Sequence, residues 1–158
     1  MLLKVSERFE STRTAPDSLV MESLTLPFEI RQKSRFRART DGGSEVGIIL
    51  ERGGGALRNG DCLRAENGAL IRIVAADEAL SHAGTHDSVL LCKAGYHLGN
   101  RHVLLQVGPG WLRYQHDHVL DDMVRGLGIE VEHIMAPFEP EPGAYGGDGH
   151  GHHHGYRP

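Results

Sequence analysis

Short apolar stretches separated by glycine-rich turns dominate the first half of the chain. Glycine runs at positions 42–43 and 53–55 interrupt any longer pattern, and no stretch shows a convincing helical period. Asn59-Gly60, between Ala56-Leu57 and Cys62-Leu63, is a good hairpin signal, because both turn residues tolerate positive φ. This half is therefore predicted to be a small all-β module.

The second half alternates between strand and helix patterns. The predicted strands are Leu70–Ala75, 103–107, Trp111–Gln115 and 129–134, and the predicted helices are 85–98 and 117–127. Gly99-Asn100 is expected to stop the first helix in a left-handed turn, whereas Asp117 caps the second and Gly128 ends it. The order β-α-β-β-α-β predicts the ferredoxin-like plan, with two helices on one face of a four-stranded sheet.

The end of the chain has little that could pack. Prolines 137, 140 and 142 and repeated glycines predict an extended, largely disordered segment. The expected fold class is therefore α+β in three parts. These are an all-β domain over residues 1–75, a ferredoxin-like domain over residues 76–142, and a disordered His-containing tail over residues 143–158.

Composition limits the class of protein. The 158 residues are 39% hydrophobic and 24% charged, which suits a globular protein with a modest core. No apolar run approaches the roughly 18–20 residues that a membrane span needs, and the N-terminus lacks a secretory pattern. Cys62 and Cys92 are far apart and form no CxxC motif, which favours a reducing compartment. We expect a cytoplasmic protein with no membrane partner.

Charge is distributed unevenly. Residues 1–40 carry 8 Lys/Arg against 5 Asp/Glu, and the remaining residues carry 9 against 16. Five cations alternate with other residues and would share one strand face: Arg31, Lys33, Arg35, Arg37 and Arg39. This face is either simply solvated or a contact surface for an acidic partner protein. Nucleic acid is disfavoured, because no aromatic residue interleaves to stack bases and the whole chain is acidic.

Histidine is unusually frequent, with eleven in the chain. Four lie within the last nine positions: His150, His152, His153 and His154. Neutral imidazole is a good ligand for Ni²⁺, Cu²⁺ and Zn²⁺, so a mobile tract of this kind predicts a metal-collecting site. The tract could instead be a purification tag, but Gly151 interrupts it and Gly155 follows it, which is unusual for such a tag.

Two further pairs of histidines lie in the predicted second domain. His97 and His102 would point about 140° apart on one unbroken helix. His97 is expected to pack or to cap the helix end, whereas His102 lies on a connecting loop that could present a ligand. His116 and His118 would share a face of an extended segment. If Asp117 caps a helix, His118 lies instead in its first turn, and structural and metal roles stay equally open.

No catalytic constellation accompanies these histidines. The chain has no HExxH, no GxSxG and no phosphate-binding loop ending in GK[ST]. A hydrolytic metal site also needs fixed ligands, an open position and a nearby base. The scattered histidines favour carriage of a metal over catalysis, so we expect no enzyme.

Several stretches resemble the urease accessory protein E (UreE) family. The most specific is residues 96–103 (YHLGNRHV), and residues 117–123 (DHVLDDM), 136–141 (APFEPE) and 52–61 follow the same order as in that family. One departure is Leu104, where the family often has proline. The resemblance spans essentially the whole chain.

This resemblance implies a peptide-binding-like β domain joined to a ferredoxin-like domain that forms homodimers, with dimers of dimers on metal binding as an option. It implies that His102 from two chains binds one Ni²⁺, helped by tail histidines, and that His116 and His118 form an extra pair in some members. It also implies delivery of nickel to the urease-activating GTPase and the urease accessory complex. The predicted metal ligands are His102, His116, His118, His150, His152, His153 and His154, with Cu²⁺ and Zn²⁺ as competing ions in vitro.

Three other functions compete with a nickel carrier. Passive storage of nickel or copper would use mainly the tail and bind several ions per dimer. A metal-dependent hydrolase would use His97, His102, His116 and His118 and would turn over test esters. An adaptor would dock its partner through the cationic strand without metal.

Overall fold

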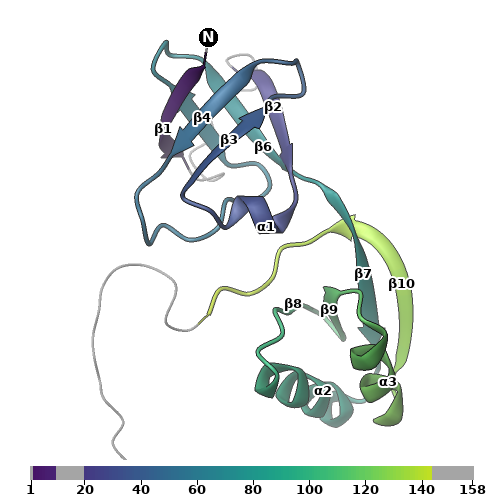
Figure 1. The fold of residues 1–158 in the computed structure, drawn as a ribbon. Coiled ribbons are helices and arrows are strands. Elements are labelled where there is room, and N and C mark those ends of the chain that lie inside the picture. Colours follow the sequence, from purple (N-terminus) through teal and green to yellow (C-terminus); the bar gives the residue numbers. More distant parts are fainter. Residues whose placement is uncertain (1, 10–19, 144–158) are drawn as a thin grey trace, which may run out of the picture.

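The computed structural model describes residues 2–9 and 20–143, which form two sheets that follow one another along the chain (Figure 1). Six strands make the first sheet and four make the second, and two helices of the described part accompany the second. This arrangement confirms the predicted α+β class. The predicted disordered tail, apart from Gly143, lies outside the described residues.

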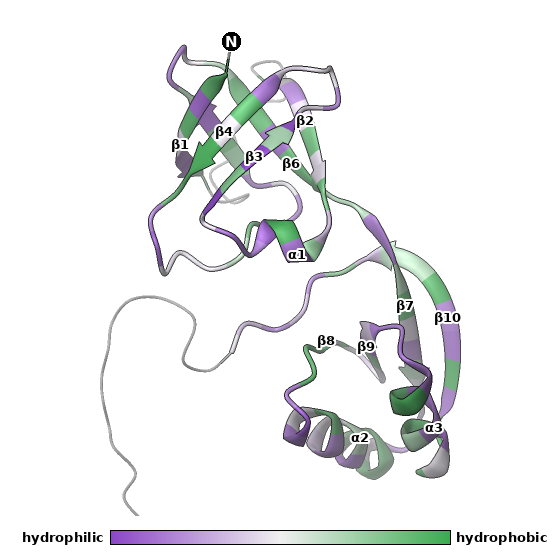
Figure 2. Ribbon diagram, in the orientation of Figure 1, coloured by the Kyte–Doolittle hydropathy of each residue, from purple (hydrophilic) through white to green (hydrophobic). Residues whose placement is uncertain are grey.

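The first sheet is a barrel-like unit with the strand order β2-β6-β5-β1-β4-β3 (Figure 1). Its elements are β1 (Leu3–Phe9), β2 (Val20–Leu26), α1 (Phe28–Arg31), β3 (Arg35–Arg39), β4 (Glu45–Ile49), β5 (Cys62–Ala65) and β6 (Leu70–Ala75). Apolar residues two apart on one strand, such as Leu24 and Leu26 or Ile71 and Ile73, point to the same side and are buried together. The apolar colouring of β4 and β6 in Figure 2 follows this shared core.

Two expectations for the first domain were wrong in part. Asn59-Gly60 does form a turn, with Gly60 at φ 89°, but the residues directly before it are not a strand, because β4 ends at Ile49. Instead, the backbone N–H of Leu57 donates to the carbonyl of Arg31. Leu57 is fully buried, so core packing has taken a residue that a hairpin would have needed.

The predicted cationic face is shorter than its spacing indicated. Arg35, Arg37 and Arg39 are exposed along β3, as expected from their alternation. Arg31, by contrast, ends the short helix α1 and is buried, with 1% of its surface exposed. Pro27 is the N-cap residue of that single turn, which interrupts the strand period.

The second sheet has the order β10-β7-β9-β8, and all its neighbouring strands are antiparallel. Its elements are β7 (Asp77–Gly84), α2 (Ser88–Asn100), β8 (Gln106–Gly108), β9 (Trp111–Gln115), α3 (His118–Gly126) and β10 (Glu130–Pro137). Helix residues Ala94, Leu98 and Val124 pack with sheet residues Leu112 and Tyr114 in one core. The predicted ferredoxin-like plan is confirmed.

The first strand of this plan is not the predicted one. Leu70–Ala75 pairs with β2 and β5 in the first sheet, whereas β7 opens the second. The sequence of β7, DEALSHAG, buries Leu80, Ser81 and Ala83. Two of these are small, so their apolar signal is weak. The strand predicted at 103–107 is also shorter, because it begins only at Gln106.

Caps define where the two helices begin. The side chain of Asp87 accepts hydrogen bonds from the backbone N–H groups of Val89 and Leu90. Asp117 caps α3 in the same way, as the sequence predicted. Gly128, at φ 97°, follows the end of α3 in the left-handed conformation, which is also as predicted.

Arg31 connects the two domains. Its guanidinium donates to the carbonyl oxygens of Leu26 and Leu57 in the first domain and to that of Phe138, just after β10. The rings of Phe28 and Phe138 meet edge to face, with 5.7 Å between centroids. The segment after β10 is thereby held against the first domain. No helix in the described ranges 2–9 and 20–143 is long and apolar enough to cross a membrane.

Candidate metal centre

His102 occupies a special backbone position at the end of α2. The helix runs to Asn100, two residues beyond the predicted end at Leu98, with Arg101 as its C-cap, so the left-handed turn does not fall at Gly99-Asn100. The backbone N–H of Val103 donates to Leu98 and that of His102 to Gly99, which is the Schellman arrangement. His102 therefore takes the left-handed position, at φ 57°.

Glycine is the usual residue at this position, because a Cβ atom is disfavoured at positive φ. His102 is the only non-glycine residue with positive φ in the part of the chain that the structure describes. Its side chain is exposed. Strained backbone of this kind is concentrated at functional sites, so the conformation marks His102 independently of the sequence resemblance.

Within residues 2–9 and 20–143, His102 belongs to no group of three or more potential metal ligands. Among the described residues, the only group of three or more potential metal ligands lies elsewhere. His97 is exposed, and its ring contacts the edge of Tyr96 at 5.3 Å between centroids. The expectation that His97 packs or caps was therefore wrong, because Leu98 rather than His97 turns into the core.

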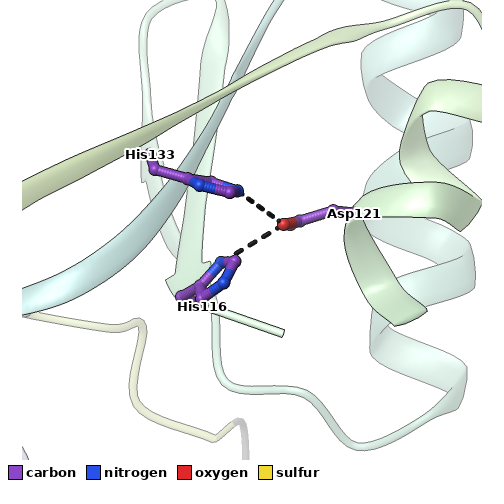
Figure 3. A group of neighbouring side chains, drawn as sticks. All are labelled: His116, Asp121 and His133. Atoms are coloured by element: carbon purple, nitrogen blue, oxygen red, sulfur yellow. Dashed lines mark hydrogen bonds and ion pairs between the residues drawn. The ribbon is translucent and has the colours of Figure 1, made fainter. Parts of the chain in front are cut away.

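A cluster of two histidines and one aspartate lies beside helix α3 (Figure 3). Asp121 of α3 points toward His116, just after β9, and His133 of β10. One oxygen, Oδ2 of Asp121, is 2.9 Å from Nε2 of His133 and 3.2 Å from Nδ1 of His116. The two imidazole rings are 4.0 Å apart between centroids. Three chemically suitable groups thus converge from three separate elements.

The register of the sheet explains this convergence. His133 is paired with Ser81 of β7, and Ser81 is paired with Tyr114 of β9, so the three residues form one row across the sheet. Cross-strand neighbours share a face, and His116 follows Tyr114 by two positions. Helix α3 packs over this face and adds Asp121.

The buried carboxylate of Asp121 is held by several donors. The hydroxyl of Tyr114 donates to its Oδ1 at 2.7 Å. Burial alone would raise the pKa of Asp121, but hydrogen bonds from Ser81, Tyr114 and His133 outweigh it and hold that pKa below its usual value. Burial and the contact with Asp121 raise the pKa of Tyr114. Asp121 is therefore an anion, and Tyr114 a proton donor, at neutral pH.

The expected pair of His116 and His118 does not join in this cluster. His118 is the first residue of α3 and is exposed, and it is outside the group that His116 forms. The residue beside His116 is His133, which its sequence position had not marked as a ligand. Only the pairing of β10 and β9 on either side of β7 could have indicated this neighbour.

The tail histidines, His150, His152, His153 and His154, lie outside the described residues. The segment that leads to them is nevertheless placed. The backbone N–H of Glu141 donates to the carbonyl oxygen of Leu105 at 2.7 Å, and that of Glu139 to Oε1 of Gln106. The segment from Glu139 to Glu141, just before the tail, is thus held close to the loop that carries His102.

Known proteins match both parts of the chain. The model of the N-terminal domain of the UreE urease accessory protein matches residues 5–76, and that of its C-terminal domain matches residues 78–157. A urease accessory protein UreE of Alkalilimnicola ehrlichii is 62% identical over 125 residues, covering 79% of this chain and 76% of that protein. The UreE of Teredinibacter turnerae is 50% identical over 143 residues, covering 90% and 92%. That of Citrobacter koseri is 49% identical over 156 residues, covering 98% and 99%.

Proposed function

Because this chain belongs to the UreE family of urease accessory proteins, we propose that it carries Ni²⁺ to urease during urease maturation. Family membership makes it a urease accessory protein, and we propose no enzymatic activity for it. The observation that carries the nickel proposal is His102, an exposed imidazole held in a strained conformation at the end of α2. A carrier needs ligands that are accessible to a partner, and His102 meets that need.

One imidazole alone holds an ion weakly, so the proposal requires a second copy. A two-fold axis near His102 would present the same ligand twice. Helix α2 supports such an axis, because Val89 and Tyr96 lie seven residues apart on one stripe and are 61% and 66% exposed. Leu104 and Val107, beyond His102, are also exposed. We propose that this apolar stripe and loop form a homodimer interface with His102 at its axis.

Tail histidines would complete the coordination. The hydrogen bond from Glu141 to Leu105 holds the segment just before the tail near His102, because Leu105 follows His102 by only three residues. From Gly143, a further seven residues to His150 span at most about 25 Å. Neutral imidazoles are suitable ligands for Ni²⁺. Ligands that are exchanged one at a time would allow the ion to be passed on.

The receiving partner in this proposal is the urease-activating GTPase with the urease accessory complex. The exposed arginines of β3 are a suitable surface for an acidic partner. Metal binding that joins two dimers through their tails is an extension of the same scheme. We place the protein in the cytoplasm, because Cys62 and Cys92 are both free thiols.

Calorimetric titration with Ni²⁺ tests the proposal on the full chain. One variant replaces all four tail histidines by alanine, and a second adds His102→Ala. His97→Ala is the matched control, since His97 is an exposed imidazole at the same helix end. We expect the tail variant to keep one Ni²⁺ equivalent per dimer at His102, and this one equivalent to be lost with His102→Ala but kept with His97→Ala.

The alternative is storage of nickel or copper by the tail. It predicts several ions per dimer in the wild-type protein, and no bound ion that depends on His102 once the tail histidines are replaced. That result would refute a core site at His102. Copper and zinc titrations of the same variants would then define which ions compete.

A further inference from the structure

His116, His133 and Asp121 offer two imidazoles and a carboxylate within a single chain. The possible ligand atoms all lie within 4.8 Å of one another. We propose that these three residues form a second site for a borderline divalent metal ion, of the class Ni²⁺, Cu²⁺ and Zn²⁺. This site needs no second subunit, no tail and no His102, so it stands independently of the proposed nickel carrier.

The spacing of the three groups fits an ion. Nitrogen and oxygen ligands at about 2.0–2.2 Å from a metal are about 3.0–3.5 Å from each other in tetrahedral or octahedral geometry. Oδ2 of Asp121 is already 2.9 Å from His133 and 3.2 Å from His116. A hydrogen bond now joins Asp121 to His133, and an ion-pair contact joins it to His116. Small ring movements would let one ion take the place of both contacts.

Charge favours a cation at this place. Asp121 is 1% exposed, and a buried carboxylate is costly without a counter-charge. Within residues 2–9 and 20–143, its only ion-pair partners are His116 and His133, which are charged only when protonated. Among the described residues, no lysine or arginine therefore forms an ion pair with this carboxylate. A divalent ion would supply that charge while both imidazoles bind in their neutral form.

The groups behind the ligands support the same assignment. Tyr114 donates to Oδ1 of Asp121, which orients the carboxylate and leaves Oδ2 facing the imidazoles. Ser81 also donates to Asp121, and its Oγ, 3.3 Å from Nδ1 of His116, would leave that nitrogen free for the ion. Such hydrogen bonds to ligands strengthen and orient metal sites. The side chains of His116 and His133 are 38% and 55% exposed, so an ion can enter and keep water in its open positions.

Two other accounts of the cluster must be separated from this one. The cluster could be only a hydrogen-bond link that ties α3 to the sheet. Alternatively, His116 could bind metal with His118, which is two residues away and exposed. The substitutions His133→Gln and His116→Asn separate them, because an amide keeps an N–H donor toward Asp121 but is a poor ligand for these metals.

The experiment uses the full chain with His102 and the four tail histidines replaced by alanine, and Zn²⁺ as the probe. We expect one Zn²⁺ per chain by calorimetry, and a dissociation constant raised at least about tenfold by His133→Gln or His116→Asn. His118→Gln is the matched control and should change it less than twofold. Thermal melting without metal should be similar for all variants, which keeps loss of folding apart from loss of a ligand.

Nitrogen-15 NMR of the histidine rings gives a second reading. Zn²⁺ should shift Nε2 of His133 and Nδ1 of His116 together, while the ring of His118 stays unchanged. Absence of Zn²⁺ binding in this background, or binding unaffected by His133→Gln, would overturn the proposal. Loss of binding in His118→Gln with retention in His133→Gln would assign the ion to the His116 and His118 pair instead. None of these results bears on nickel at His102, which this background lacks.

Discussion

Replacing Arg31 tests how the two domains are held together. In Arg31→Met the side chain keeps a similar length and apolar stem but loses every donor. The carbonyl oxygens of Leu26, Leu57 and Phe138 would then remain buried without their present partner. The change should therefore destabilise the whole chain and release the segment after β10.

The magnitude follows from those three bonds. Each buried acceptor left without a donor costs roughly 1–3 kcal/mol. Part of this loss is offset, because a buried guanidinium is itself costly, and burial lowers the pKa of Arg31. We expect a net loss of about 3–5 kcal/mol in the free energy of unfolding, a large fraction of the stability of an ordinary domain.

Urea unfolding followed by circular dichroism measures the loss, and hydrogen exchange locates it. Amides of Glu139 and Glu141, which bond to Gln106 and Leu105, should lose protection in Arg31→Met. The matched control is Arg35→Met on the exposed face of β3, which should change stability by less than about 0.5 kcal/mol. A loss below about 1 kcal/mol in Arg31→Met, or equal losses in both variants, would refute the reasoning.

Four further predictions rest on single residues. His102→Gly should relieve the strain at φ 57° and stabilise the fold by about 0.5–1 kcal/mol in thermal melting, and a destabilised variant would contradict the strain. In calorimetry the same variant should lose the one nickel equivalent per dimer that is proposed at His102. Tyr114→Phe removes the 2.7 Å bond to Asp121 and should cost about 1.5–3 kcal/mol in urea unfolding, and a neutral effect would show that this bond adds no net stability. Tyr96→Lys should shift sedimentation from dimer to monomer, and an unchanged dimer would place the interface elsewhere. Burial and the charge of Arg113 lower the pKa of His82 from 6.5, so the unfolded chain binds this proton more readily and the free energy of unfolding falls as the pH drops below 6.5. His82→Gln should make the free energy of unfolding less dependent on pH in this range, and an unchanged pH dependence would contradict the reasoning.

Much of the second domain could be predicted from local patterns. Asp117 and Gly128 mark the limits of α3 because capping depends on a few neighbouring backbone groups. The first helix does end at Asn100, but its left-handed turn lies at His102 and not at Gly99-Asn100, because the backbone N–H of Val103 bonds to Leu98 and both residues pack into the core. The identity of this histidine as a ligand came from resemblance, and it stays a prediction.

The sequence alone determined the α+β class, the order of strands and helices that follow β7 in the second domain, the caps of α3 and the histidines available for metal. These depend on periodicity and on contacts between near neighbours. Only the tertiary structure decided that Arg31 is buried between the domains and that His133 lies beside His116 and Asp121. The physical reason is that sheet register brings together residues far apart in the chain, and no local pattern records which strands will be neighbours.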